Sequence, residues 1–357
     1  MRRLAQPLLA VALGLTLGLA VTWFAGEDPR HVLQVLAKGA FGSRYDLGMT
    51  VFYATPLIFT GLSVAIAFHA GLFNVGAEGQ LTLGALAAAT VGAVCSGMPW
   101  PIAPILAGLA AIMAGTLWGA LPGWLRARRG SHEVINTIML NFVAAGISSY
   151  VVLYLLKNPD SQNPESRPVG AGYLIHQFAF FGGAPVSSAL PVALLAAALV
   201  WFLLWRTPLG FEIRSVGQCE SAARAAGIVP GRIRIIALSL AGALAGMVGI
   251  SEVLGNSGKF IVGFSPDYGF MGIAVALLGR NHPAGVVAAA FLFGALHKGT
   301  ADLDLETDHV TRELSLVLQA LIILSVSADA LWIWLRKSWR TVSESEIRNP
   351  KSGAGTP

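Results

Sequence analysis

Three polar side chains lie close together in the stretch FHAGLFNVGAEGQLTLGA, which covers residues 68–85. They are Asn74, Glu78 and Gln80, with glycines between them. Two carboxamides and a carboxylate can donate and accept hydrogen bonds, which is the chemistry that binds a small polar solute. Strongly apolar segments flank the stretch, and polar groups persist in such surroundings only where they are paired or face water. The alternative is structural, because Asn74 and Glu78 would also cap the helix that follows.

A second group of candidates lies in two other apolar segments. In HEVINTIMLNF, Thr137 and Asn141 are spaced i,i+4 and therefore share one face of a helix, which could line a solute pathway. Hydrogen bonds between helices would explain the same residues. Glu252 is a further pathway candidate near the end of an apolar segment, with pairing to Lys259 or a solvated helix end as its alternatives.

Patterns typical of catalysis or metal binding are missing from the sequence. No convincing G-x-S-x-G, paired-aspartate or HExxH motif occurs. Cys95 and Cys219 have neither metal-ligand nor disulfide spacing. We therefore expect no catalytic residue and no metal site, and an intramembrane enzyme is disfavoured.

The composition identifies the solvent around these residues. The 357 residues are 55% hydrophobic and 12% charged, with a mean hydropathy of +0.65. A soluble domain carries about twice that charged fraction. Water is thus not the solvent for most of the surface, and the 41 glycines suit helices that pack closely within a membrane. The sequence predicts an all-α, polytopic membrane protein.

About ten apolar segments are candidates for membrane-spanning helices. The first follows Arg2 and Arg3, is too long for a cleaved signal peptide and is expected to be a retained helix. The eighth is too short to cross alone and is expected to be a half-helix or a re-entrant piece. The predicted spans are residues 7–25, 49–69, 79–97, 102–123, 134–156, 187–205, 235–254, 268–279, 283–298 and 314–335.

The distribution of lysine and arginine sets the expected orientation. With the N-terminus placed in the cytoplasm, about two thirds of the 24 lysines and arginines fall in cytoplasmic segments, as the positive-inside rule requires. The net charge of +5 is then a topology signal and not a sign of nucleic-acid binding. We expect one transmembrane domain over 1–340 with both termini cytoplasmic, a periplasmic or extracellular loop at 157–186, a cytoplasmic loop at 206–234 and a polar tail at 341–357.

The loop at 206–234 contains the segment SVGQCESAARAA, which predicts one short helix from Ser215 to Ala226. Glu220 and Arg224 are spaced i,i+4 and would stabilise an exposed helix. The glycine that follows would close it. Alanines and glycines would make this helix a slim knob that fits a groove on a partner. A solvated basic loop that only fixes topology is the alternative.

Three segments of the chain resemble one transporter family. GFEIRSVGQCESAARAAGI is similar to the cytoplasmic coupling loop of ABC importer permeases. GLFNVGAEGQLTLGALAAA and HEVINTIMLNFVAAGISSYV resemble the permeases of nucleoside and simple-sugar importers, within the ribose/branched-chain amino acid permease superfamily. The resemblance runs from Val51 to Leu335 and departs from the pattern at Cys219-Glu220, where the family often has Asn-Pro. It implies ATPase coupling by Gly217, Gln218, Glu220, Ala222, Ala223, Arg224 and Gly227.

The resemblance implies a permease subunit that imports a nucleoside or a simple sugar and is powered by a separate ATPase. The sequence agrees, because it has no G-x-x-x-x-G-K-[ST] motif to hold ATP. The implied partners are a second permease subunit, expected to be a different chain, an ATPase subunit that binds ATP and Mg²⁺, and an extracellular or periplasmic solute-binding protein or lipoprotein. The chain itself is expected to bind no cofactor and to lie in the bacterial plasma (inner) membrane. A nucleoside base could stack on Phe68, Phe73, Phe264, Tyr268 or Phe270, unless these rings belong to the membrane interface.

A secondary transporter of a small polar solute, driven by an ion gradient, is the main alternative. Such a protein needs carboxylates inside the membrane to bind H⁺ or Na⁺. The candidates Glu78, Glu252 and Asp329 all lie near the ends of apolar segments, which argues against this alternative.

A faint internal repeat connects two distant segments. HAGLFNVGAEGQL and GNSGKFIVGFSPDYGF both place glycines and polar groups beside a short apolar piece. Transporters often contain such repeats, and they use interrupted helices to turn polar groups toward a cavity at the membrane midplane.

Overall fold

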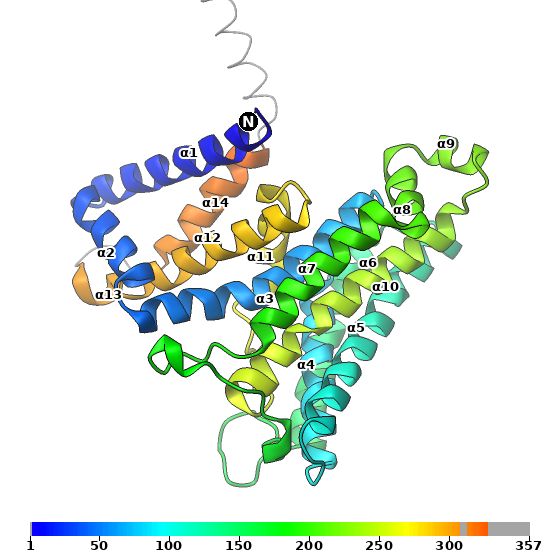
Figure 1. Ribbon diagram of the computed structural model, residues 1–357, viewed down its shortest axis with the longest axis horizontal. Coiled ribbons are helices and arrows are strands. Elements are labelled where there is room, and N and C mark those ends of the chain that lie inside the picture. Colours follow the sequence, from blue (N-terminus) through cyan, green and yellow to red (C-terminus); the bar gives the residue numbers. More distant parts are fainter. Residues whose placement is uncertain (1, 308–312, 328–357) are drawn as a thin grey trace, which may run out of the picture.

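The computed structural model describes residues 2–307 and 313–327 (Figure 1). Within those ranges it contains helices and three isolated β-bridges but no strand, which confirms the all-α prediction. The predicted tail at 341–357 and the end of the last predicted span lie outside the described residues. The α-helices are α1 Arg2–Phe24, α2 Pro29–Phe41, α3 Arg44–His69, α4 Ala77–Val94, α5 Ile102–Arg129, α6 Glu133–Tyr150, α7 Ala189–Arg206, α8 Pro208–Gln218, α9 Glu220–Ala225, α10 Pro230–Gly246, α11 Tyr268–Leu278, α12 Pro283–Ala301, α13 Leu303–Glu306 and α14 Leu314–Ser327.

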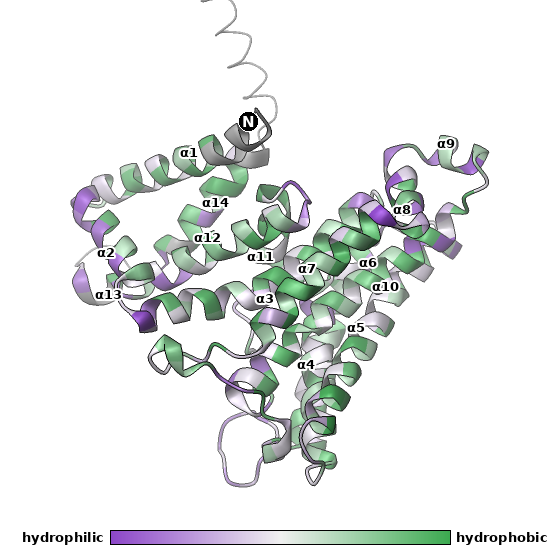
Figure 2. Ribbon diagram, in the orientation of Figure 1, coloured by the Kyte–Doolittle hydropathy of each residue, from purple (hydrophilic) through white to green (hydrophobic). Residues whose placement is uncertain are grey.

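Several of these helices are long enough to cross a membrane. Helix α6 continues into a π-helical turn, Val151–Leu155, and α10 is followed by a π-helical segment, η4, Ile250–Ser257. Figure 2 shows apolar residues along the helices and polar residues gathered toward their ends. The chain is therefore a polytopic membrane protein, as predicted. Six segments of the described chain are long and apolar enough to span: Arg44–His69, Ile102–Arg129, Glu133–Leu155, Ala189–Arg206, Pro230–Ser257 and Pro283–Ala301.

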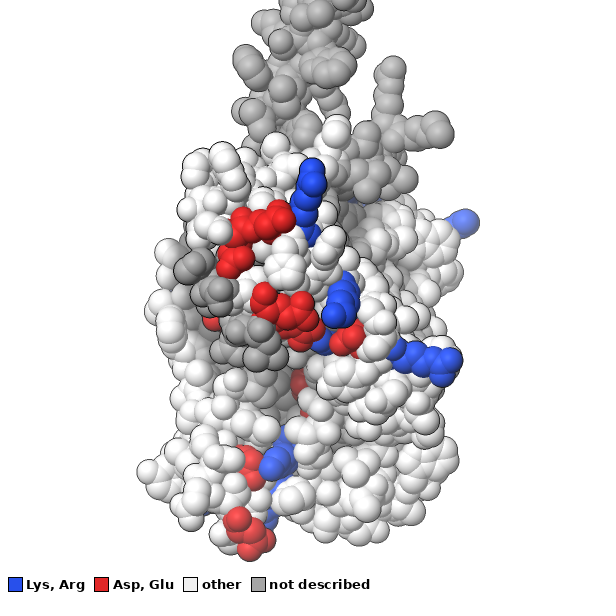
Figure 3. All heavy atoms as spheres, turned by 90° about the vertical axis from the view of Figure 1, so that its left-hand side faces the viewer, with Lys and Arg blue, Asp and Glu red and all other residues white. Residues whose placement is uncertain are grey.

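Helices α2 and α13 lie outside the predicted spans. Helix α2 begins because the Asp28 carboxylate accepts the backbone N–H of Arg30 and Pro29 occupies the first helical position. Figure 3 shows acidic and basic side chains gathered on the face of the molecule where these short helices lie. Among them, Lys298 pairs with Asp46 at 3.1 Å and with Asp302 at 3.2 Å. This charged face is one polar end of the bundle.

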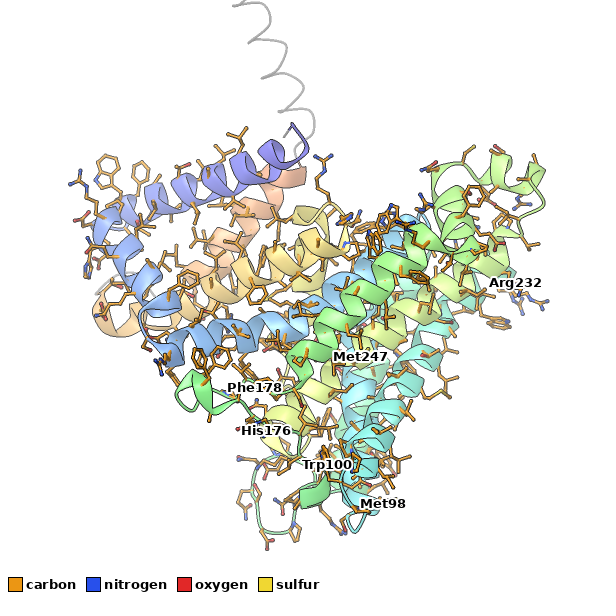
Figure 4. The ribbon with its side chains drawn as sticks, in the orientation of Figure 1. Met98, Trp100, His176, Phe178, Arg232 and Met247 are labelled. Carbon is orange, nitrogen blue, oxygen red and sulfur yellow. The ribbon has the colours of Figure 1, made fainter. Side chains whose placement is uncertain are left out.

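A second polar end carries α8 and α9, and we call it the α9 end. A third carries residues 157–186, and we call it the loop end. Figure 4 places Arg232 near the α9 end of α10 and Met247, the C-cap residue, at the opposite end of that helix. Met98 and Trp100 lie toward the loop end in the same view. Helices α5 and α10 thus run between the α9 end and the loop end.

Glycines allow α5 and α10 to pack with their backbones in contact. A Cβ atom added at Gly242 would overlap the carbonyl oxygen of Gly115, and one added at Gly115 would overlap the carbonyl oxygen of Gly242. The same relation holds between Gly119 and the carbonyl oxygen of Leu238. Without side chains between them, helices in a membrane gain van der Waals contact along their whole length. This pairing makes α10 part of one rigid unit with α5.

Two helices begin inside the bundle instead of at its ends. Gly84 of α4 contacts Gly246 of α10, so α4 starts part-way along its neighbour. Helix α11 has 11 residues and is therefore about 16 Å long, roughly half the thickness of the hydrocarbon core. The eighth predicted span is thus a half-helix, as expected.

Candidate functional site

The first turns of α4 and α11 meet inside the bundle, and the two segments of the faint internal repeat supply them. A Cβ added at Gly269 would overlap the backbone nitrogen of Glu78, so only glycine lets the two backbones approach this closely. The backbone N–H of Gly269 donates a hydrogen bond of 2.7 Å to Glu78 Oε2. We call residues 74–80, together with residues 265–269, the half-helix junction.

Glu78 lies in the first turn of its own helix, α4, and its carboxylate also stabilises the start of α11. Its carboxylate accepts an N–H from the first turn of α11, where the helix dipole favours negative charge. Ser265 interacts with the same carboxylate and also caps the backbone N–H of Tyr268. The N-cap of α4 is Gly76, without a side-chain cap bond, so neither Asn74 nor Glu78 is the N-cap residue, whereas the place of Glu78 in the first turn of α4 fits the structural alternative.

Asn74 and Gln80 form a closed pair of buried amides. Asn74 Nδ2 donates to Gln80 Oε1 at 2.9 Å, and Gln80 Nε2 donates back to Asn74 Oδ1 at 3.1 Å. Asn74 Nδ2 also donates to Ser63 Oγ of α3 at 3.1 Å. Both side chains are satisfied within the protein, so in this conformation they hold the turn before α4 in place.

Thr137 and Asn141 lie on one face of α6, as their spacing predicts, and this face contacts the half-helix junction. Asn141 Oδ1 accepts the backbone N–H of Gly79 at 2.9 Å, and its Nδ2 donates to the carbonyl oxygen of Val75 at 3.0 Å. The Thr137 hydroxyl donates to the carbonyl oxygen of Glu133 at 2.8 Å. A side chain from another helix thus provides the cap that α4 lacks.

Replacing Asn141 by leucine is expected to destabilise the protein. The change leaves a buried N–H and a buried carbonyl without partners, at a cost of about 1–3 kcal/mol for each. Thermal unfolding of the detergent-purified protein should show a clearly lower midpoint. Asn136→Leu is the matched control, because Asn136 is in the same helix and bonds only to the nearby Ser131 Oγ. Equal midpoints for the two variants would contradict the assignment.

Glu252 lies on η4, separate from the junction but close to it. Its side chain is 7% exposed; Oε2 accepts from Asn256 Nδ2 at 3.3 Å, and Tyr268 also interacts with the carboxyl group. Lys259 pairs instead with Glu165 at 2.8 Å, so neither expected alternative for Glu252, a lysine pair or a solvated helix end, describes its surroundings.

The predicted coupling helix is two helices and not one. Helix α8 ends at Gln218, Cys219 is extended with φ −157° and ψ 105°, and α9 begins at Glu220. The break fits a tertiary contact, because the backbone of Gly217 packs directly on the carbonyl oxygen of His69 at the end of α3. A continuous helix from 215 to 226 is therefore wrong, and α9 stands out from the bundle as a knob (Figure 1).

Glu220 connects this knob to α10. Its carboxylate accepts hydrogen bonds from Arg224 in α9, at 2.7 Å, and from Arg234 in α10. These guanidinium groups, Arg224 first, hold the pKa of Glu220 below its usual value, so the carboxylate is charged at neutral pH. Gly227 ends the segment with φ +82°, as expected for a closing glycine. Of the remaining predicted coupling residues, Gln218 and Ala222 are exposed and Ala223 is buried.

Sequence reasoning missed several partners of the candidate residues, among them Ser63 and Gly269. Ser63 occupies an apolar helix without any polar neighbour in sequence to single it out. Gly269 belongs to the faint repeat, which was a usable signal. No cluster of three or more His, Cys, Asp or Glu side chains able to hold a metal occurs in the part of the chain that the structure describes.

Comparison with known proteins identifies the family to which the chain belongs. Residues 47–327 match the family described as the permease component of branched-chain amino acid transport systems. The chain belongs to this permease family. The permease is 36% identical to a guanosine ABC transporter permease protein of Bacillus subtilis over 92% of its own length and 94% of that protein. It is 34% identical to a glucose ABC transporter permease protein of Haloferax volcanii, over 89% and 85% of the two chains.

A third relative extends the match over nearly the whole permease. A nucleoside ABC transporter permease protein of Lactococcus lactis is 30% identical, over 98% of both chains. No solved structure matches the permease. The chain is therefore a membrane-embedded permease subunit of an ABC importer, a class that works with an ATPase and a solute-binding protein.

Proposed function

We propose that this permease forms half of the translocation pathway of a nucleoside importer in the bacterial plasma (inner) membrane. The relatives from B. subtilis and L. lactis, at 36% and 30% identity, are named for guanosine and nucleoside transport. Residues 1–340 act as one transmembrane domain. A second permease chain, different from this one, supplies the other half, and an extracellular binding protein or lipoprotein delivers the solute.

The α9 end faces the cytoplasm, with both termini on that side. Arg126, Arg128 and Arg129 in the last turn of α5 support this orientation, because lysine and arginine concentrate in cytoplasmic segments. The α9 knob then meets the partner ATPase, which holds ATP and Mg²⁺, and the permease itself binds no cofactor. The loop end faces the binding protein.

The observation that carries the mechanism is the connection from α9 to α10 through Glu220 and Arg234. When the ATPase moves α9, this ion pair transmits the displacement to α10, which packs on α5 through glycine contacts and runs beside α4. The half-helix junction lies where α4 and α11 begin, so the motion reaches the broken helices. ATP thereby stabilises one of two bundle conformations, which gives alternating access.

Uptake by the reconstituted importer tests this proposal. The permease, its partner permease and the ATPase are placed in liposomes and supplied with binding protein and radiolabelled guanosine. Uptake is expected to require ATP on the side of the liposome membrane to which the α9 end is exposed. Uptake driven by a proton or sodium gradient without ATP would instead establish an ion-coupled secondary transporter.

A simple sugar is the second candidate solute, because a relative of 34% identity is named for glucose transport. Competition for guanosine uptake by unlabelled glucose separates the two candidates. We expect unlabelled nucleosides to compete and glucose to have no effect. Competition by glucose alone would assign a sugar.

A further inference from the structure

One carboxyl oxygen of Glu252 has no hydrogen-bond partner in the described part of the fold, although the Tyr268 side chain interacts with the same carboxyl group. Glu252 is 7% exposed, and its Oε1 has no hydrogen-bond partner among the described residues, whereas Oε2 receives the long bond from Asn256. An unsatisfied buried carboxylate oxygen is costly, so such an oxygen in a native protein calls for an explanation. The neighbouring ammonium group of Lys259 does not provide one, because it is 2.8 Å from Glu165.

The carboxyl group lines a cavity of about 150 Å³ between η4 and the segment that leads to α11. Asn256, Phe260 and Phe264 line the same cavity, as does Lys259, whose ammonium group pairs with Glu165. A cavity of about 150 Å³ accepts a single aromatic ring such as benzene, so it can take the six-membered ring of a purine but not a whole nucleoside. The Phe264 ring is partly exposed and offers aromatic surface to a flat occupant, whereas Phe260 is 1% exposed and packs edge to face against Phe264, with centroids 5.5 Å apart. We call this cavity the Glu252 pocket.

The chemistry of the pocket defines its ligand. A carboxylate accepts hydrogen bonds from two neighbouring N–H donors, whereas it repels carbonyl oxygens and unprotonated ring nitrogens. Guanine presents such donors, a ring N–H beside an exocyclic amino group, on one edge. Hypoxanthine has the ring N–H but lacks the amino group, and adenine has an unprotonated nitrogen where guanine has its N–H.

We propose that the Glu252 pocket is a subsite that reads the donor edge of a guanine-type base, with Glu252 as the acceptor and Phe264 as the ring contact. This inference rests on the proposed function and narrows it to one class of nucleoside. Tyr268 interacts with Glu252 and begins α11, and the next residue, Gly269, bonds to Glu78. A base in the pocket would therefore lie beside the half-helix junction, which begins one residue after Phe264.

The ratio of guanosine to inosine uptake in the reconstituted importer tests the subsite. Glu252→Gln keeps the size of the side chain and the bond from Asn256, but it turns an N–H₂ group toward the pocket. The guanosine-to-inosine ratio is expected to fall about tenfold, equivalent to about 1.4 kcal/mol. Because the same binding protein serves every variant, a change in the ratio reports the permease and not the binding protein.

Two further variants separate recognition from damage. Phe264→Ala removes a ring contact and should lower uptake of both nucleosides alike, with their ratio unchanged. Glu306→Gln makes the same carboxylate-to-amide change on an exposed residue of α13, outside both the loop end and the α9 end, and should leave both uptake rates as in the parent.

If Glu252→Gln leaves the guanosine-to-inosine uptake ratio unchanged, or lowers uptake of both nucleosides equally, the subsite is overturned. ATP-driven uptake by the parent complex would still support the proposed function in that case. Absence of ATP-driven uptake of either nucleoside by the parent complex overturns the proposed function itself. The two failures are therefore distinct results of the same assay.

Discussion

Gly242→Leu is expected to prevent the permease from reaching a stable folded state. Any side chain at this position overlaps the carbonyl oxygen of Gly115 in α5. The clash involves backbone on both sides, so no rotamer change relieves it, and α5 and α10 must separate along much of their shared length. Overpacking a core typically costs about 1–3 kcal/mol where side chains can adjust, and a larger loss is expected here. Fluorescence-detected gel filtration of detergent extracts should show aggregate or no protein.

Gly146→Leu provides the matched control. Gly146 is also in a membrane-spanning helix, but a Cβ at that position has no atom within 4 Å. The control should elute as a single symmetrical peak with an unchanged thermal midpoint. A monodisperse Gly242→Leu protein of parental stability would show that the α5–α10 contact is not essential to the fold.

The apolar runs predicted the helices, because a long span must be apolar wherever it contacts lipid. Each predicted span contains a helix, including the half-helix α11. Helix α2 was not predicted, because its 13 residues are too few to span a membrane and include Arg30, His31 and Lys38. Its start depends on a local cap, which hydropathy does not register.

The hydrogen-bond partners of the candidate residues were harder to predict than the candidate residues themselves. Asn74, Glu78, Gln80 and Asn141 were selectable as polar residues in apolar sequence. The partner of Glu78 is Gly269, 191 residues away, and that contact depends on how two broken helices cross. Periodicity along one helix contains no information about such a crossing. Only the faint repeat hinted that the two segments were related.

The coupling segment shows the same limit. The spacing of Glu220 and Arg224 correctly predicted an i,i+4 ion pair. The break at Cys219 was not predicted, because it accompanies packing of Gly217 on the end of α3, a contact between distant segments. The bond from Arg234 to Glu220, which links α9 to α10, likewise depends on tertiary structure.

Replacing Glu220 and Arg224 together by leucine is expected to uncouple ATP hydrolysis from uptake. The double change removes both the exposed pair within α9 and the ion pair with Arg234. Solute uptake should fall at least about tenfold, whereas the assembled complex continues to hydrolyse ATP; such a loss corresponds to about 1.4 kcal/mol of coupling. Uptake and ATPase rates are measured on the same proteoliposomes, and normal uptake by a correctly inserted double variant would refute the coupling role.

Arg234→Leu distinguishes transmission from docking. Arg234 belongs to α10 and its side chain is 19% exposed, so the change leaves the outward surface of α9 as it is. The ATPase should still co-purify with this variant, and uptake per ATP hydrolysed should fall as in the double variant. Normal transport by Arg234→Leu, together with complete loss of the ATPase from the double variant, would show that α9 is only a docking surface. The movement would then reach the bundle through another contact. The packing of Gly217 against the end of α3 is the next candidate for that contact.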